Sequence, residues 1–321
     1  MASVPKKYSP IELAKIFAYR RMHPELTKPQ IIRDLKLSSR EATLISFALY
    51  NEQAMREALR ERPKYRVLLA GDFHCGHKAG LTPQGYQLPL DSVADKTFAE
   101  FQRETWNFFI NTIDSLKPFT HAIFNGDLID GDGKKSKGTE LITTDRNIQV
   151  DMAVKVMDTV GANVNVISYG TPYHAGDGEA FEYNIAQQTG AILNAENLLN
   201  IGGIIFNVKH HVGGSSTPYG AATPLLKDAL WSDLWAQMEH NPTADIVVRS
   251  HAHTFIRIDD GFRTAVVLPA LQGAMTKFGT LRCTKVVHWG FAYVDIFSDG
   301  HYEFHEVLHS PESQRRKVIE L

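Results

Sequence analysis

Aspartate and histidine residues recur in three short motifs, each directly after a run of apolar residues. The motifs are Gly71-Asp72-Phe73-His74, Gly126-Asp127-Leu128-Ile129-Asp130 and Ser250-His251-Ala252-His253. Carboxylates and imidazoles gathered from several strand ends are the donors that a pair of divalent metal ions needs. The chemistry that they indicate is metal-dependent hydrolysis of a phosphoester.

Each motif alone is weak evidence. The chain has 14 histidines in 321 residues, so roughly one His-x-His pair is expected by chance in a sequence of this composition. Gly-Asp is commoner still, as an ordinary turn. Taken singly, each motif is better explained as structural. Their joint order, spacing and position after apolar runs carry the functional interpretation.

In this order, the motifs resemble the signature of the calcineurin-like metallophosphoesterase superfamily, from about residue 65 to about residue 275. The family's Asp-x-His is matched by Asp72-Phe73-His74, and its Gly-Asp-x-x-Asp by Gly126–Asp130. Its late Gly-His-x-His is matched by Ser250–His253, with Ser in place of Gly. Two further segments, Asp-Phe-His-Cys-Gly-His and Gly-Thr-Pro-Tyr-His, resemble more loosely the variants of phage and prophage members.

The resemblance implies that these side chains are divided between two metal sites. Asp127 would bridge the two ions. The family's isolated histidine has two candidates here, His210 and His211, of which family variants favour His210. Asp130 is expected to orient a ligand histidine rather than to bind metal itself. The implied ligands are Asp72, His74, Asp127 and His253 for one ion, and Asp127, His210 and His251 for the other.

One motif departs from the family pattern. The usual element is Gly-Asn-His-Asp/Glu, in which Asn binds the second metal, but this chain has Gly170-Thr171-Pro172-Tyr173-His174. We expect His174 to be the general acid that protonates the leaving oxygen. Either Thr171 or water would replace the missing Asn, so the second site is expected to be the weaker one. Mixed Asp/His ligation favours Mn, with Fe, Zn or Ni as alternatives, over Mg or Ca.

Alternating strands and helices after Pro63 are expected to position these motifs. Such alternation predicts an α/β domain with much parallel sheet. Beyond residue 254 the pattern changes to strands with turns, and Asp299-Gly300 is a hairpin signal. The resemblance implies a calcineurin-like four-layer α/β/β/α sandwich for residues 63–321. The expected strands are 65–70, 119–125, 162–169, 204–209 and 245–249, and the expected helices 92–116, 144–160, 178–188 and 222–239.

The first 62 residues are predicted to form a small all-α domain. Thr27-Lys28-Pro29-Gln30 and Ser38-Ser39-Arg40-Glu41 fit capping boxes, so two helices should follow a helix that begins near Ser9. The segment Lys28–Leu49 resembles the helix-turn-helix of DNA-binding regulators. A three-helix cap or an oligomerisation module fits the same pattern. The segment has 12 Lys/Arg and 7 Asp/Glu, a net charge of +5, which is modest for a DNA-binding domain.

Net charge and the lengths of apolar runs limit the function classes that remain. The net charge is −2, no apolar run could cross a bilayer, and no secretory signal follows the N-terminal lysines. We therefore expect a cytoplasmic protein without a membrane partner, and the resemblance to phage and prophage members implies a bacterial host that carries a phage or prophage. The leading hypothesis is a dinuclear phosphodiesterase or nuclease, for which a helix-turn-helix beside the site would make nucleic acid such as DNA the natural substrate. The alternatives are a DNA-binding or assembly protein with a degenerate phosphoesterase domain, and a phosphomonoesterase or protein phosphatase.

Overall fold

The computed structural model describes residues 16, 19, 22–23, 26–37, 62–175, 180–215, 217–282, 285–315, 318 and 320. Residue contacts divide the chain into two compact units, Met1–Arg62 and Pro63–Leu321. Within the part that the structure describes, no helix is both long and apolar enough to cross a membrane.

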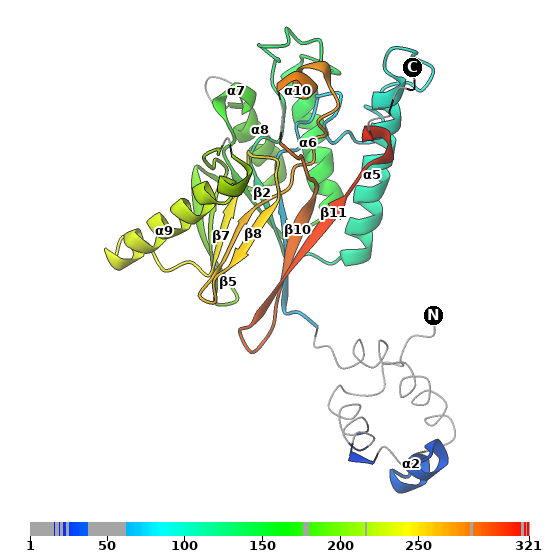
Figure 1. Cartoon of the computed structure of the whole chain (residues 1–321), viewed down its shortest axis with the longest axis vertical. Coiled ribbons are helices and arrows are strands. Elements are labelled where there is room, and N and C mark those ends of the chain that lie inside the picture. Colours follow the sequence, from blue (N-terminus) through cyan, green and yellow to red (C-terminus); the bar gives the residue numbers. More distant parts are fainter. Residues whose placement is uncertain are drawn as a thin grey trace. The chain divides into compact units, whose positions relative to one another are not determined.

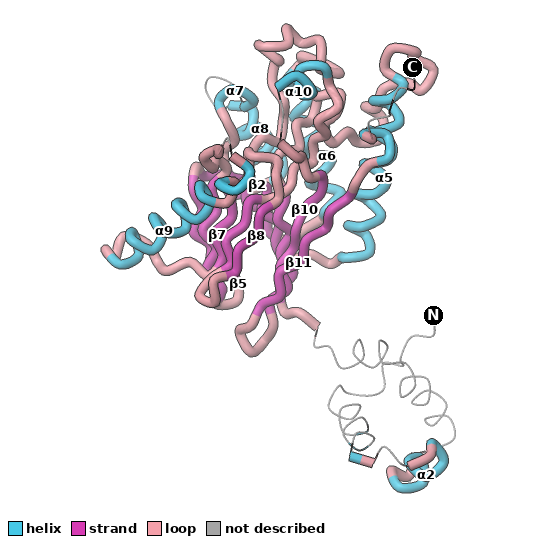
Figure 2. Tube along the Cα trace, in the orientation of Figure 1, coloured by secondary structure: helices cyan, strands magenta, loops and turns pink. Residues whose placement is uncertain are grey.

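The second unit contains two β-sheets (Figures 1 and 2). Strands β1 to β4 of the larger sheet are parallel, and β10 and β11 extend it as an antiparallel hairpin. The order of that sheet is β11 (Tyr302–His309), β10 (Trp289–Ile296), β1 (Tyr65–Ala70), β2 (His121–Asn125), β3 (Val164–Ser168) and β4 (Ile192–Asn194).

The smaller sheet has a parallel centre and antiparallel edges. Strands β6, β7 and β9 run parallel, and β5 and β8 close the two sides. Its central strands are rich in β-branched residues, as expected of strands that are covered on both faces. The order is β5 (Glu196–Ile201), β6 (Ile204–Lys209), β7 (Ile246–Arg249), β9 (Thr264–Val267) and β8 (Ile256–Asp259).

Helices cover the outer faces of the two sheets, which pack against each other. Along β1, Val67 and Leu69 enter the core between the sheets, whereas Leu68 and Ala70 face the helices, as the period of two requires. The larger sheet is covered by α5 (Lys96–Leu116), α6 (Arg146–Val160) and α8 (Ala180–Thr189), and the smaller by α9 (Thr223–Gln237). The expected four-layer α/β/β/α sandwich is therefore confirmed.

The predicted elements are present with small changes at their ends. The strand expected at 119–125 is β2 and begins at His121, and the helix expected at 92–116 is α5 and begins at Lys96. The Asp299-Gly300 turn does connect β10 to β11. Several short elements of the described residues were not predicted, because runs of three to six residues give too little periodicity. They include β4, β5, α7 (Pro172–Ala175) and α10 (Lys277–Arg282).

The described part of the first unit includes one of the predicted helices. Helix α2 spans Lys28–Asp34 and buries Ile31. The predicted capping box is present at its start, where the amide of Thr27 donates to the Gln30 side chain at 2.8 Å. The second helix of the proposed helix-turn-helix, expected from residue 38 towards 60, lies outside the described residues, and the preceding helix, expected from residue 9, lies largely outside them. The helix-turn-helix therefore stays a prediction.

Candidate metal centre

The candidate metal ligands lie at the carboxyl ends of parallel strands. The loops after β1 and β2 carry the aspartate motifs of the larger sheet, and the loops after β6 and β7 carry the histidine motifs of the smaller sheet. Because the two sheets pack face to face, these two edges meet. The side chains that converge there are those of Asp72, His74, Asp127, Asp130, His174, His210, His251 and His253.

Main-chain hydrogen bonds lock the ligand-bearing loops together. The amide of Asp72 donates to the carbonyl of Gly126 at 2.9 Å, and the amide of His74 donates to the carbonyl of Asp127 at 3.0 Å. From the other sheet, the amide of His251 donates to Oδ2 of Asp72 at 3.1 Å. The positions of the ligand side chains therefore rest on a cross-linked backbone.

Five of the candidate ligands have a left-handed backbone conformation. Their φ angles lie between 46° and 70°, a region that residues other than glycine rarely occupy. Each such residue costs of order 1 kcal/mol or more, and such strain gathers at functional sites. The strain indicates that the sharp turns after β1, β2 and β7 serve side-chain placement. The five residues are Asp72, His74, Asp127, His251 and His253.

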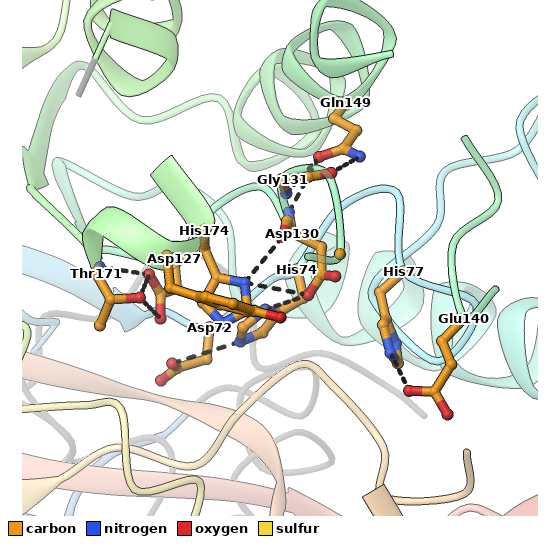
Figure 3. Close-up of polar contacts among 12 residues, drawn as sticks. Asp72, His74, His77, Asp127, Asp130, Gly131, Glu140, Gln149, Thr171 and His174 are labelled. Carbon is orange, nitrogen blue, oxygen red and sulfur yellow. Dashed lines mark hydrogen bonds and ion pairs between the residues drawn. The ribbon is translucent and has the colours of Figure 1, made fainter. Parts of the chain in front are cut away.

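The first donor group combines Asp72, His74 and His253. Nε2 of His253 lies 3.2 Å from Oδ1 of Asp72 and 3.2 Å from Nε2 of His74. Nε2 of His74 is 3.8 Å from the same Asp72 oxygen. Three donor atoms thus surround one point, and Figure 3 shows Asp72 and His74 in this arrangement.

The second donor group combines Asp127, His210 and His251. Oδ2 of Asp127 lies 3.1 Å from Nε2 of His210 and 3.8 Å from Nδ1 of His251. Nε2 of His210 is also 4.0 Å from Oδ1 of Asp72. The two groups are therefore adjacent, with Asp72 and Asp127 between the imidazoles.

These two groups fit divalent metal ions. In each, the donor atoms all lie within 4.8 Å of one another. Oδ1 of Asp72 is fully buried and accepts no hydrogen bond, which is costly for a carboxylate unless a cation satisfies it. Mixed imidazole and carboxylate donors suit Mn, Fe, Zn or Ni. Asp72, Asp127 and the four histidines could hold such ions.

Without metal, the carboxylates and imidazoles stabilise one another's charges. Burial alone would raise the pKa of Asp72 and Asp127, but the adjacent histidines hold the pKa of both carboxyls well below the ordinary range. Burial opposes the charge of His74 and His210 as well. Asp130 and Asp72 nevertheless raise the pKa of His74 to about 10, and Asp127 raises that of His210 to about 9.

Asp130 lies behind His74, on the side away from the first donor group. Its Oδ1 is 2.8 Å from Nδ1 of His74, so His74 keeps Nε2 for the first group. Gln149 of α6 holds this loop, because its Oε1 accepts from the amide of Gly131 at 2.9 Å and its Nε2 donates to the Gly131 carbonyl at 2.7 Å (Figure 3). This carboxylate–histidine pair is the arrangement that orients metal-binding imidazoles.

Thr171 and His174 both lie at the centre, in the loop after β3. The amide of Thr171 donates to Oδ1 of Asp127 at 2.7 Å, and its hydroxyl donates to the same oxygen at 3.1 Å. Thr171 thus contacts the carboxylate that was expected to bridge the metals. Nδ1 of His174 lies 2.9 Å from the carbonyl of Asp130, and its ring stands edge-on to His74 at 4.5 Å. Burial and the charge of His74 lower the pKa of His174.

His210 and His211, the two candidates for the histidine ligand after β6, differ in burial and in contacts. His210 is buried, and its Nδ1 donates to the carbonyl of Asn125 at 2.6 Å, which directs Nε2 to Asp127. His211 is exposed and stacks on the ring of His251, with centroids 5.0 Å apart. Among the described residues, His211 belongs to no converging donor group.

The sequence analysis assigned no role to three residues that support the centre, namely Glu182, Asn125 and Ser250. Glu182 of α8 is fully buried and accepts from the amide of Gly170 at 2.8 Å. Burial and the charge of Asp127 raise its pKa to about 7. Asn125 donates to the hydroxyl of Ser250 at 2.9 Å, which links β2 to the loop after β7. A single Glu on a helix has no distinguishing pattern, whereas the Ser that replaces the family's Gly at 250 was a usable signal.

Gly170 lies where no side chain would fit. A Cβ at this position would be 2.3 Å from both the amide nitrogen and Oδ1 of Asp127. The glycine therefore allows the loop after β3 to contact the Asp127 loop directly, which brings Thr171 to the carboxylate.

A cleft of about 400 Å³ opens over the donor groups. Its walls include His174, His251 and His253 from the centre, together with Lys135 and Tyr173. The Lys135 ammonium lies over the Tyr173 ring, 5.0 Å from its centroid. The cleft thus combines the proposed metal-binding edge with a cation and an aromatic ring.

Comparison with known proteins gives distant matches among solved structures. No family model matches the chain, and no curated protein matches it. Among similar solved structures, a single mutant of Vps29 from Entamoeba histolytica is 15% identical, with 76% of this chain and 99% of that chain covered and a TM-score of 0.40. An archaeal phosphodiesterase is 12% identical, with 75% and 99% covered and a TM-score of 0.40.

A predicted phosphoesterase from Streptococcus pneumoniae is 12% identical, with 76% of this chain and 98% of that chain covered and a TM-score of 0.31. These likenesses are low in both sequence and structure.

Proposed function

We propose that this chain is a metal-dependent phosphoester hydrolase of the calcineurin-like metallophosphoesterase type, acting on phosphodiesters. One observation carries the proposal. Two adjacent groups of Asp and His donors converge at the meeting edges of two sheets, below an open cleft. Two adjacent metal sites of this composition suit an in-line displacement at phosphorus.

The proposed cofactor is a pair of divalent ions, with Mn as the expected metal. Asp72, His74 and His253 would hold one ion, and His210 and His251 the other. Asp127 would be shared between them. The bound pair would supply charge neutralisation at the phosphoryl oxygens and an activated water.

Residues around the donors would orient them and move a proton. Asp130 fixes the ring of His74, and Thr171 fixes the carboxylate of Asp127 in the place where the family has Asn. Nδ1 of His174 donates to the Asp130 carbonyl, so Nε2 is the nitrogen left to exchange a proton with a molecule in the cleft. We assign His174 the protonation of the leaving oxygen.

Nucleic acid is the proposed substrate class. Lys135 lines the cleft, where it can pair with a phosphate, and Tyr173 offers a ring for base stacking. The basic segment 1–62 would add electrostatic affinity for DNA, so binding should weaken as salt rises.

The direct test is hydrolysis by the purified full chain loaded with Mn(II). We expect turnover of bis(p-nitrophenyl) phosphate and cleavage of DNA, and faster turnover of the diester than of p-nitrophenyl phosphate. Asp127→Asn should abolish the activity, because it replaces the shared carboxylate with a neutral amide. No hydrolysis of any of these substrates with Mn, Fe, Zn or Ni would overturn the proposal, and activity that survives Asp127→Asn would come from a contaminant.

A second candidate is a binding or assembly protein whose phosphoesterase site no longer turns over. The observation that favours it is Thr171, which stands where the family's Asn would bind the second metal. Metal analysis separates the two. Two bound ions per chain support the enzyme, and a chain that retains none supports the binding role.

A further inference from the structure

Helix α9 presents a broad apolar face to solvent. Six large apolar side chains, five along it and Met238 directly after its last residue, are between 37% and 66% exposed. In Figure 1 the helix lies on the outside of the smaller sheet, and its C-terminal end projects beyond the neighbouring elements. The six residues, which we call the α9 face, are Leu226, Leu230, Trp231, Leu234, Trp235 and Met238.

The α9 face lies opposite the side of the helix that packs on the sheet. Leu225, Ala229 and Ser232 are the buried residues of α9, and Leu225 and Ala229 join the core under the helix. At 100° per residue, the exposed apolar positions span about half of the helix circumference, centred opposite these three. A helix that is apolar on all sides is normally covered on all sides.

The acidic residues of α9 are turned toward the body of the domain. Asp228 accepts from Nε of Arg249 at 2.9 Å, and Asp233 pairs with Arg263. Within the helix, Lys227 is the charged residue left on the exposed side, and the polar residue Gln237, near the other end of that side, is neutral. The face is therefore nearly uncharged, which disfavours exposure to water and favours contact with a surface like itself.

We infer that the α9 face is the interface between two copies of this chain. The six side chains leave on the order of 600 Å² of apolar surface in water, close to the roughly 800 Å² per partner that a standard protein interface buries. Single patches of this size on a monomer usually mark a binding surface.

The spacing of these side chains allows the helix to pair with itself about a twofold axis. Leu226, Leu230, Leu234 and Met238 form one ridge at intervals of four, and Trp231 and Trp235 form the next. The leucine ridge of one copy can fill the groove between the two ridges of the other. If the twofold axis passes between Leu230 and Leu234, two antiparallel α9 helices place Lys227 of one copy opposite Gln237 of the other. The two Lys227 side chains then lie apart.

Sedimentation equilibrium on the full chain tests this inference. We expect a mass of twice 36.0 kDa at micromolar concentration. Leu230→Glu places two carboxylates near the twofold axis and should weaken association at least 100-fold. Because Leu230 is 58% exposed, Leu230→Glu should leave the monomer folded, with the far-UV circular dichroism spectrum of the wild type. The matched control is Phe262→Glu, at a residue that is 89% exposed outside the α9 face, and it should remain dimeric.

Tryptophan fluorescence gives an independent readout. The chain has four tryptophans, of which Trp106 and Trp289 are buried and Trp231 and Trp235 lie in the α9 face. Dilution of the wild type should shift the emission to the red and increase quenching by iodide, and Leu230→Glu should start in that state. If Leu230→Glu fails to fold, Trp235→Glu replaces it.

Three outcomes would overturn the inference. These are a wild type that is monomeric at 100 µM, a dimer that survives the folded α9-face variant (Leu230→Glu, or Trp235→Glu in its place), and tryptophans that iodide reaches equally in the dimer and the monomer. A dimer that survives would place the contact elsewhere in the chain.

Discussion

At the scale of single residues, the centre depends on ligands held in strained positions and on the groups behind them. Five Asp and His residues adopt left-handed backbone, and main-chain hydrogen bonds from neighbouring loops hold them there. Behind His74, Asp130 accepts from Nδ1 and so fixes which nitrogen faces the metal. Residues that do not bind metal should therefore control how tightly metal binds.

Asp130→Asn tests this dependence. The amide keeps the shape but loses the charge that raises the basicity of His74, so metal affinity should fall about 10- to 100-fold. Competition with a fluorescent chelator measures this directly. Asp132→Asn, in the same loop but paired with Arg146, is the matched control and should bind metal as the wild type does. Equal affinity of Asp130→Asn and wild type would contradict the role of Asp130.

Metal affinity should depend steeply on pH. In the metal-free protein the pKa of His74 is about 10 and that of His210 about 9, so both are imidazolium at pH 7. Metal binds the neutral ring, so each site must release a proton, and affinity should fall about tenfold for each pH unit below 9. Chelator competition at pH 6.5, 7.5 and 8.5 gives the slope. A flat profile would mean that these histidines are not ligands.

The same pKa values determine how the stability of the metal-free protein depends on pH. A histidine whose pKa is raised on folding stabilises the fold fully below about pH 6.5, its unfolded value. That contribution is lost as pH rises through 9 to 10. Added metal should remove this loss, because it replaces the proton as the cation between the carboxylates.

At the scale of elements, Glu182 connects helix α8 to the loop after β3. It accepts from the Gly170 amide, and Gly170 in turn contacts the Asp127 loop. The helix thus supports the loop that carries both Thr171 and His174. A carboxyl group buried beside Asp127 is costly when ionised, which is why its pKa is raised to about 7.

Glu182→Gln should show this cost as a change in stability with pH. When the pKa of a carboxyl rises from 4.5 to about 7 on folding, the free energy of unfolding of the protein falls as pH rises between these values. The glutamine side chain does not ionise, so the variant has no such decrease. Its free energy of unfolding relative to the wild type should increase by about 2 to 3 kcal/mol from pH 5 to pH 8. Urea unfolding of the metal-free proteins at both pH values measures it.

Two further variants complete that experiment. Glu100→Gln, on the exposed side of α5, is the matched control and should show no such change. Glu182→Leu leaves the Gly170 amide without an acceptor and should destabilise by about 1 to 3 kcal/mol at pH 5. If the free energies of unfolding of the wild type and Glu182→Gln change equally with pH, Glu182 does not have the raised pKa.

At the scale of the whole molecule, the second unit contains everything that the centre needs. Two sheets and their covering helices form three apolar cores, and every candidate ligand lies after residue 63. The first unit has a net charge of +5, which leaves −7 for the rest of the chain from a total of −2.

Removal of residues 1–62 should separate metal binding from DNA binding. The shortened chain should keep its metal stoichiometry, and its thermal midpoint should change by only a few degrees, because a domain with its own core folds by itself. DNA affinity should fall at least tenfold, since the remaining chain is acidic. Fluorescence anisotropy with labelled DNA at two salt concentrations measures this. Unchanged DNA affinity would remove the nucleic-acid role of the first unit.

Several parts of this molecule were predictable from local patterns. The strand before each motif was visible because buried central strands are continuous apolar runs, and β1, β6 and β7 lie where expected. The α/β class and the C-terminal hairpin followed from the same kind of local signal. Short edge strands such as β5 were missed, because half-exposed segments of six residues have little apolar periodicity.

The sequence by itself determined which residues could do chemistry, because motif spacing and strand ends are local properties of the chain. Only the tertiary structure decided which donors meet, because Asp72 and His253 are 181 positions apart and come together through the packing of two sheets. It also distinguished buried His210 from exposed His211, brought Thr171 to Asp127, and showed Glu182 and the α9 face. Burial and contact depend on the whole fold, and no local pattern records them.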